Sequence, residues 1–184
     1  MVSGIVLAGG TSSRMATNKL LMTFRGKPLL SYVIDTLRTV VDEIVVVTGH
    51  YHQEISAFLA SYQDIRVVCN NDYAKGMFTS VKTGAKAAKG DLCIIPGDYP
   101  LVSPRTYVAL LAQTGLVRVP VFQGRRGHPL FLEEKLQPLL LAEPDDGNLK
   151  QFRDRYPITD VVVDDEGVIR SEERRVGKEG RSRW

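Results

Sequence analysis

The chain begins with the run Val2-Ser3-Gly4-Ile5-Val6-Leu7-Ala8-Gly9-Gly10, which is apolar until it reaches two glycines. A short apolar run that stops at glycine is typical of a strand buried on both faces of a parallel sheet. Polar and small residues follow it as far as Lys19. The start of the chain therefore predicts a first β-strand that leads into a glycine-rich loop.

Further along the chain, two kinds of apolar pattern alternate. Short β-branched or apolar runs predict strands at residues 43–48, 65–69, 92–95, 116–121, 130–132 and 161–163. Helical spacing predicts helices at residues 29–40, 52–62, 78–88, 104–111, 135–141 and 149–156. Strands that alternate with helices form βαβ units. We expect a three-layer α/β fold of Rossmann-like kind, with helices on both faces of a mostly parallel sheet.

The composition suits one globular domain. Of the 184 residues, 43% are hydrophobic and 24% are charged, which excludes a disordered or fibrous chain. The net charge is only +3, and residues 171–184 supply two of these charges, so the charge does not indicate a nucleic-acid partner. We expect one domain over residues 1–170. Residues 171–184 form a basic tail whose composition predicts a disordered or foreign segment.

The start of the chain, the length of its apolar runs and its cysteines indicate the cellular compartment. The first residues lack the basic and apolar regions of a secretory signal, and no apolar run reaches the roughly 18 residues of a membrane span. Cys69 and Cys93 are far apart in the sequence and show no metal-binding or redox spacing, so we expect free thiols in the core. These features predict a cytoplasmic protein without a membrane partner.

The loop after the first strand is the first candidate phosphate site. Gly9 and Gly10 let the backbone approach a ligand closely, and three hydroxyl residues, 11–13, follow them. Arg14 can bind a phosphate with two nitrogens, and Lys19 adds a point charge. The P-loop and dinucleotide-binding motifs are both absent. The alternative reading is an ordinary turn of small residues with surface charges.

Two other predicted strands also end in loops that contain candidate functional residues. Asp98 follows residues 92–95 and can hold Mg²⁺ against substrate phosphates, although a turn aspartate is the plain alternative. The loop that spans residues 70–80 opens a helix whose first amides can meet an anion, or can simply be capped by Thr79 and Ser80. Ligands bind beyond the carboxyl ends of strands in such sheets, so these loops share the expected site.

A fourth loop, residues 123–129, is rich in glycine and arginine. Arg125 and Arg126 precede Gly127 and His128. Basic loops are often only solvated, but a short glycine-rich loop with two arginines suits an anionic acceptor. His128 is either a general base or, more commonly for a histidine before proline, a structural hydrogen-bonding group.

These loops together resemble the signature of the molybdenum cofactor nucleotidyltransferases, a family within the GT-A-like nucleotidyltransferases. The resemblance covers roughly residues 2–170. It rests on ordered motifs, which are Leu7-Ala8-Gly9-Gly10-x-Ser12-x-Arg14-Met15-x-x-x-Lys19-Leu20-Leu21, Gly26-Lys27-Pro28-Leu29-Leu30, Val45-Val46-Val47-x-Gly49-His50, Asn70-x-x-Tyr73-x-x-Gly76-Met77-x-x-Ser80, Gly97-Asp98-x-Pro100-Leu101-Val102 and Gly124-Arg125-Arg126-Gly127-His128-Pro129.

The resemblance implies a Mg²⁺-dependent transfer of a nucleoside monophosphate to molybdopterin with release of pyrophosphate. It implies that residues 7–10 contact the base and ribose, that Arg14 and Lys19 bind the triphosphate and that Asp98 ligates Mg²⁺. The implied nucleotide-binding residues are Leu7, Ala8, Gly9, Gly10, Ser12, Arg14, Lys19, Asn70, Gly76 and Ser80. The implied acceptor-binding residues are Arg125, Arg126 and His128. A molybdoenzyme apoprotein is a further expected partner.

Two departures from the family pattern leave alternatives open. The Leu-Ala-Gly-Gly start is common in guanylyl members, whereas the acceptor-side loops are those of cytidylyl members, so we favour CTP over GTP. The family usually continues with Asp-x-Asp-Thr-Pro, where this chain has Ser171 to Arg175, with Glu173 at the second aspartate. A non-catalytic maturation chaperone that holds nucleotide or cofactor, and a sugar-phosphate nucleotidyltransferase, are the alternative functions.

Overall fold

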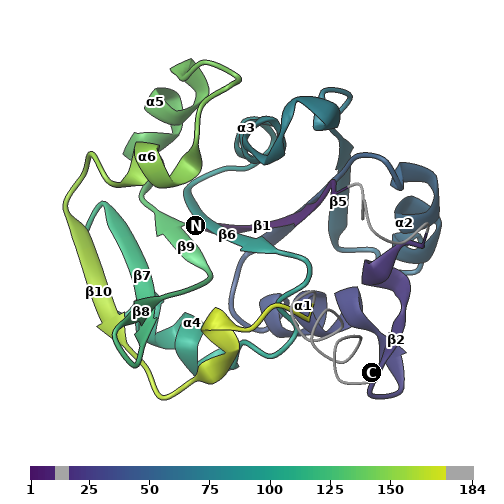
Figure 1. Cartoon of the computed structure of the whole chain (residues 1–184), viewed down its shortest axis with the longest axis horizontal. Helices are drawn as coiled ribbons and strands as arrows, with labels where there is room; N and C mark the ends of the chain where they lie inside the picture. Colours follow the sequence, from purple (N-terminus) through teal and green to yellow (C-terminus); the bar gives the residue numbers. More distant parts are fainter. Residues whose placement is uncertain (11–16, 173–184) are drawn as a thin grey trace, which may run out of the picture.

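A computed structural model of the chain describes residues 1–10 and 17–172. An eight-stranded sheet forms its centre, with the strand order β10-β7-β9-β6-β1-β4-β5 and with β8 paired to β7 (Figure 1). The strands are β1 (Val2–Ala8), β4 (Glu43–Thr48), β5 (Ile65–Cys69), β6 (Asp91–Pro96), β7 (Val117–Phe122), β8 (Arg125–Arg126), β9 (Leu130–Leu132) and β10 (Ile158–Val162). A separate small hairpin joins β2 (Thr23–Phe24) to β3 (Lys27–Pro28).

Most strands of the sheet run in one direction. β1 pairs in parallel with β4 and β6, β4 pairs in parallel with β5, and β7 pairs in parallel with β10. β9 is antiparallel to both β6 and β7, so β6 and β7 also share a direction. The carboxyl ends of the parallel strands therefore meet at one edge. The mostly parallel sheet is confirmed, whereas the antiparallel direction of β8 and β9 was not predicted.

Helices cover both faces of the sheet, which confirms the three-layer α/β fold (Figure 1). One face carries α1 (Leu29–Leu37), α2 (His52–Leu59) and α4 (Pro104–Leu111), and the other carries α3 (Met77–Ala87), α5 (Gln137–Ala142) and α6 (Leu149–Arg153). Alternate residues of a strand pack into the two hydrophobic cores, one on each face of the sheet. Ile5 and Leu7 pack in the cluster that contains α3, while Val6 and Ala8 pack in the cluster that contains α1. This is the period of two expected for a strand buried on both sides.

Two helices begin at the carboxyl edge of the sheet for identifiable local reasons. α3 begins after Gly76, whose φ of 122° lies in a region that favours glycine. α4 begins with Pro104 in its first turn, and the Ser103 hydroxyl accepts a hydrogen bond from the Arg105 N–H at 3.3 Å. Short 3₁₀ turns complete the description: η1 (Lys19–Leu21), η2 (Tyr73–Lys75), η3 (Glu134–Leu136) and η4 (Glu166–Ile169).

Cys69 and Cys93 are both free thiols, but only one lies in the core. Cys93 is buried in the central strand β6, and burial raises the pKa of its thiol to about 12. Cys69 is exposed, so the prediction of a core thiol is wrong there, because β5 is the edge strand of the sheet. Across the part of the chain that is described, no helix is long and apolar enough to span a membrane.

Candidate functional site

The loops after β1 and β6 leave the sheet as neighbours. Leu7 stands opposite Pro96 in the parallel register, and the Gly97 N–H donates to the Leu7 carbonyl at 2.9 Å. On the other side of β1, Ala8 stands opposite Thr48. The glycine loop that starts at Gly9 and the loop that carries Asp98 therefore begin at the same edge, as the sequence predicts.

Gly9 and Gly10 have different surroundings. A Cβ atom added at Gly9 would lie 2.9 Å from the Ser80 Oγ atom, so the backbone there is packed against the first turn of α3. Gly49, at the end of β4, is equally crowded, because its Cβ would lie 2.7 Å from the Gly9 carbonyl oxygen. Gly10 is exposed, and an added Cβ would meet no atom of residues 1–10 and 17–172 within 4 Å. The packed Gly9 therefore fixes the end of β1 against β4 and α3.

Asn70 is a buried anchor for the start of α3. Its Nδ2 donates to the Thr79 and Ser80 hydroxyl oxygens at 2.8 and 2.9 Å, and its Oδ1 accepts from the Asp72 N–H at 3.0 Å. The Thr79 hydroxyl in turn donates to the Gly76 carbonyl at 2.8 Å. These bonds use both ends of the amide inside the protein. Asn70 is thus placed to orient Ser80 and the turn at Gly76.

Lys19 and Asp98 lie on segments that touch each other. Lys19 begins η1, whose start is capped where the Asn18 side chain accepts from the Leu20 N–H at 3.2 Å. A Cβ added at Gly97 would lie 3.2 Å from Leu20 Cδ1, so η1 packs on the loop that carries Asp98. Lys19 and Asp98 are both half-buried. Ser12 and Arg14 lie outside the described residues.

The end of the described chain closes over the same loop. The Glu172 N–H donates to the Asp98 carbonyl at 3.0 Å, and Glu172 is 7% exposed. The prediction that the tail is disordered or lies loosely on the surface from Glu172 onward is therefore wrong at Glu172 itself, which is buried and bonded to Asp98. Glu173 and the rest of the tail lie outside the described residues.

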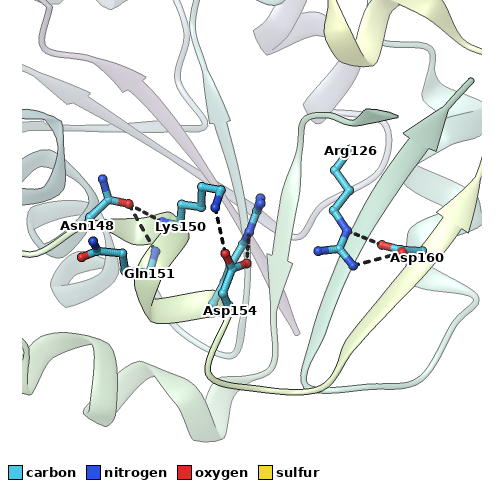
Figure 2. A network of polar contacts seen from close by, with 7 residues as sticks. Arg126, Asn148, Lys150, Gln151, Asp154 and Asp160 are labelled. Atoms are coloured by element: carbon cyan, nitrogen blue, oxygen red, sulfur yellow. Dashed lines mark hydrogen bonds and ion pairs between the residues drawn. The ribbon is translucent and has the colours of Figure 1, made fainter. Parts of the chain in front are cut away.

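The arginine loop forms a short hairpin beside the carboxyl end of β7. Gln123 and Gly124 turn the chain with φ values of 48° and 74°, and β8 then pairs antiparallel with β7. Arg125 and Arg126 are exposed. The Arg126 guanidinium donates to the Asp160 carboxylate of β10 through Nε at 2.6 Å and Nη2 at 3.1 Å (Figure 2). The loop therefore places two arginine side chains at the predicted edge of the sheet. The side chain of Arg126 is held in position by Asp160.

His128 joins the arginine loop to the Asp98 loop. Its ring lies 4.6 Å from the Tyr99 ring in an edge-to-face arrangement, and its backbone N–H donates to the Val168 carbonyl at 2.8 Å. Burial, and then the positive charge of Arg153, lower the pKa of His128 to about 4. Within the described residues its buried Nδ1 has no hydrogen-bond partner. The imidazole is therefore neutral near pH 7 and offers a phosphate no charge.

The acidic residues fit a metal ion that arrives with a phosphate ligand. Within residues 1–10 and 17–172, no three His, Cys, Asp or Glu side chains form a group that could hold a metal ion. Mg²⁺ usually binds through one or two carboxylates plus substrate phosphates and water. A half-buried Asp98 on a loop that starts next to the end of β1 suits that mode of binding.

Asp165 was missed at the level of sequence. Its Oδ2 accepts from the Ser103 N–H at 2.8 Å and from the Thr106 hydroxyl at 2.6 Å. It thereby ties η4 to the start of α4, just after the Asp98 loop. The Arg126–Asp160 pair was missed in the same way. No local pattern identifies such partners, because they are distant in the sequence and meet only through the sheet.

Comparison with known proteins agrees with this geometry. Residues 4–160 match the MobA-like NTP transferase domain family. The molybdenum cofactor cytidylyltransferase of Escherichia coli is 27% identical over 170 residues, which cover 87% of this chain and 88% of that protein. A probable molybdenum cofactor guanylyltransferase of Bacillus cereus is 29% identical over 153 residues, which cover 77% of this chain and 74% of that protein.

The fold comparison points the same way. The solved structure of a nucleotidyl transferase from a Methanothermobacter species superposes with a TM-score of 0.77 at 27% identity, covering 89% of this chain and 88% of that one. The match to the family spans most of the chain and includes β1, β6 and the loops that follow them at the carboxyl edge. The chain therefore belongs to the MobA-like NTP transferase domain family and is a nucleotidyltransferase of the kind that includes the molybdenum cofactor cytidylyl- and guanylyltransferases.

Proposed function

We propose that this protein transfers CMP from CTP to molybdopterin in the cytoplasm, with Mg²⁺ as its metal ion and pyrophosphate as the second product. One observation carries the proposal. Gly9 and Gly10 after β1, the turn that begins at Lys19 and the loop of Asp98 all lie at the carboxyl edge of β1 and β6. This is where doubly wound sheets bind nucleotides.

The nucleotide half of the site uses backbone as much as side chains. Residues 7–10 contact the base and ribose in this proposal, because they end β1 at the carboxyl edge and Gly10 is exposed there. Gly76 and Ser80, anchored by Asn70, lie beside these residues at the start of α3. Ser12, Arg14 and Lys19 bind the triphosphate by hydrogen bonds and charge.

Asp98 is the proposed ligand of the metal ion. Nucleotidyltransferases of this family generally use a divalent metal ion, and an oxygen site with a single carboxylate suits Mg²⁺ carried by phosphates. When bound, the ion neutralises charge on the transferring phosphates. The Asp98 carboxylate would hold this ion, while the Glu172 N–H donates to the backbone carbonyl of Asp98 and fixes its loop.

The reaction needs no covalent intermediate with the protein. A terminal phosphate oxygen of the acceptor forms a bond to the α-phosphorus of CTP. The bond from the α-phosphorus to the oxygen that bridges to the β-phosphate breaks, and that oxygen leaves with pyrophosphate. Such transfers depend on positioning and charge neutralisation. Arg125 and Arg126 hold the acceptor in this proposal, and the neutral His128 packs behind them on Tyr99.

CTP is preferred over GTP because the acceptor-side loops are those of cytidylyl members. The E. coli cytidylyltransferase also aligns over a larger share of this chain than the B. cereus guanylyl relative does. The test is pyrophosphate release with molybdopterin and each of four nucleoside triphosphates in Mg²⁺. We expect the fastest release with CTP. Faster release with GTP would assign a guanylyltransferase instead.

The departure from the family pattern after Arg170 favours one second candidate, a maturation chaperone that binds nucleotide or cofactor without turnover. The same panel separates the two functions. A chaperone would bind CTP or molybdopterin in a calorimetric titration but would release no pyrophosphate with any nucleotide. Mg²⁺-dependent release from the purified protein would exclude this alternative.

A further inference from the structure

The Arg126–Asp160 pair links two strands that do not pair with each other. Arg126 lies on β8, opposite Val121 of β7, and Asp160 lies on β10, opposite Val119 of the same strand. The arginine side chain therefore reaches across β7 to its partner (Figure 2). Both side chains are partly exposed, at 38% and 46%. The pair lies at the surface, within reach of a ligand.

The geometry of the pair leaves part of the guanidinium available. Asp160 accepts from Nε and Nη2, which form one edge of the planar group. Within the part of the chain that the structure describes, Nη1 has no hydrogen-bond partner. A guanidinium can bind a carboxylate along one edge and a phosphate along another, because its five N–H donors are fixed in a plane.

The surroundings of Arg126 keep a positive balance. Just after α6, Asp154 accepts from Lys150 Nζ and from Arg153 Nε, each at 3.1 Å (Figure 2). The hydrogen bond and charge of Asp160, together with the charge of Asp154, raise the pKa of Arg126. Three cationic side chains, Arg126, Lys150 and Arg153, thus accompany two carboxylates, Asp154 and Asp160. The net positive charge suits a phosphate dianion.

We propose that Asp160 is a positioning residue that holds the Arg126 guanidinium with its Nη1 edge turned to the terminal phosphate of the acceptor. The proposal rests on the proposed function and adds a residue to its acceptor site. Asp160 touches no reacting atom. It acts by removing the rotational freedom of a long side chain, so that less entropy is lost when the phosphomonoester binds.

The test compares two substitutions of Asp160 with a matched control. Asp160→Asn keeps the shape and removes the charge, and Asp160→Glu keeps the charge. We expect Asp160→Asn to raise the KM for molybdopterin about tenfold with little change in the KM for CTP, and Asp160→Glu to recover part of the loss. Asp64→Asn breaks another exposed arginine–aspartate pair, Arg38–Asp64, and should change neither KM. An unchanged acceptor KM in Asp160→Asn, or equal losses for both substrates, would overturn the proposal.

Binding of inorganic phosphate provides a readout that needs no turnover. The Nε–H resonance of Arg126, assigned with Arg126→Lys, is followed by NMR during a phosphate titration. We expect phosphate to bind the parent about tenfold more tightly than Asp160→Asn. If the parent releases no pyrophosphate but this difference is found, the proposed function fails and the role of Asp160 stands. If transfer is found and both proteins bind phosphate equally, only the role of Asp160 fails.

Discussion

Asn70 and Asp98 show how burial separates two kinds of polar residue at the same edge of the sheet. Asn70 is buried, and hydrogen bonds inside the protein use both ends of its amide. Asp98 is only half-buried, and its backbone carbonyl is tied down by Glu172. A residue whose polar atoms are all used internally shapes a site, whereas a carboxylate on a strand-end loop can act in it.

Asp98→Asn tests the metal assignment. The substitution keeps the side-chain shape but removes the charge that a divalent ion needs, so we expect Mg²⁺-dependent pyrophosphate release to fall by about a hundredfold or more. The melting temperature should change little, because the residue is not in the core. Turnover equal to that of the parent at saturating Mg²⁺ would reduce Asp98 to a turn residue.

The neutral state of His128 predicts a dependence of stability on pH. In the unfolded chain its pKa returns to about 6.5, whereas in the folded chain burial keeps the pKa at about 4. Between these values the unfolded chain binds more protons, so the contribution to stability is complete above pH 6.5 and is lost as the pH falls towards 4. Urea denaturation at pH 7.5 and pH 5 should show a larger loss for the parent than for His128→Gln. The same loss in both proteins would contradict the prediction.

At the scale of single elements, α3 packs unusually closely on the sheet. A Cβ added at Gly84 would lie 2.5 Å from Ile5 Cγ2 and 2.9 Å from Val47 Cγ2. The helix therefore approaches β1 and β4 at a position where only glycine fits. Since the first turn of the same helix carries Ser80, this close packing also sets the distance between α3 and the glycine loop.

Gly84→Ala should lower the free energy of unfolding by about 1–3 kcal/mol through overpacking. The loss should appear although alanine favours a helix by about 1 kcal/mol over glycine. Chemical denaturation measures the difference. Gly10→Ala is the control, because an added Cβ there meets no atom of the described residues within 4 Å, and its effect should stay within about 0.5 kcal/mol. A stabilised Gly84→Ala protein would show that α3 can move away from the sheet.

At the scale of the whole molecule, residues after β10 connect the two halves of the site. Asp165 binds the start of α4, the Val168 carbonyl accepts from the His128 N–H, and Glu172 binds the Asp98 carbonyl. The Asp98 loop and the arginine loop belong to different parts of the chain, and this returning segment contacts both of them. The last described residues are therefore part of the domain.

Two truncations locate the end of the domain. Removal of residues 173–184 should change the free energy of unfolding by less than about 0.5 kcal/mol, because the composition of that segment offers little apolar area to bury. Truncation after Arg170 should cost about 1 kcal/mol more, because it also removes Glu172 and its backbone bond to Asp98. Urea denaturation of both truncated chains measures the difference. Equal stability of the two truncated chains would show that Glu172 contributes nothing.

The linear sequence was sufficient for the α-helices and the longer strands, although some of their bounds differ and the short strands β2, β3 and β8 were not predicted. Apolar periodicity identified β4, β5, β9 and α4 at their observed bounds, because local patterning reports which faces are buried. Gly9, Lys19 and Asp98 were recognised because the ends of parallel strands must share an edge. These inferences need only local pattern and the rules of parallel sheets.

Other features exist only because distant segments meet in the folded chain. The antiparallel direction of β9, the pairing of Arg126 with Asp160 and the bond from Glu172 to Asp98 depend on which strands become neighbours. Residue type alone does not reveal such contacts, because a surface aspartate and a positioning aspartate look the same in the sequence. Strand order and register decide between them, and these are settled by the packing of the whole sheet.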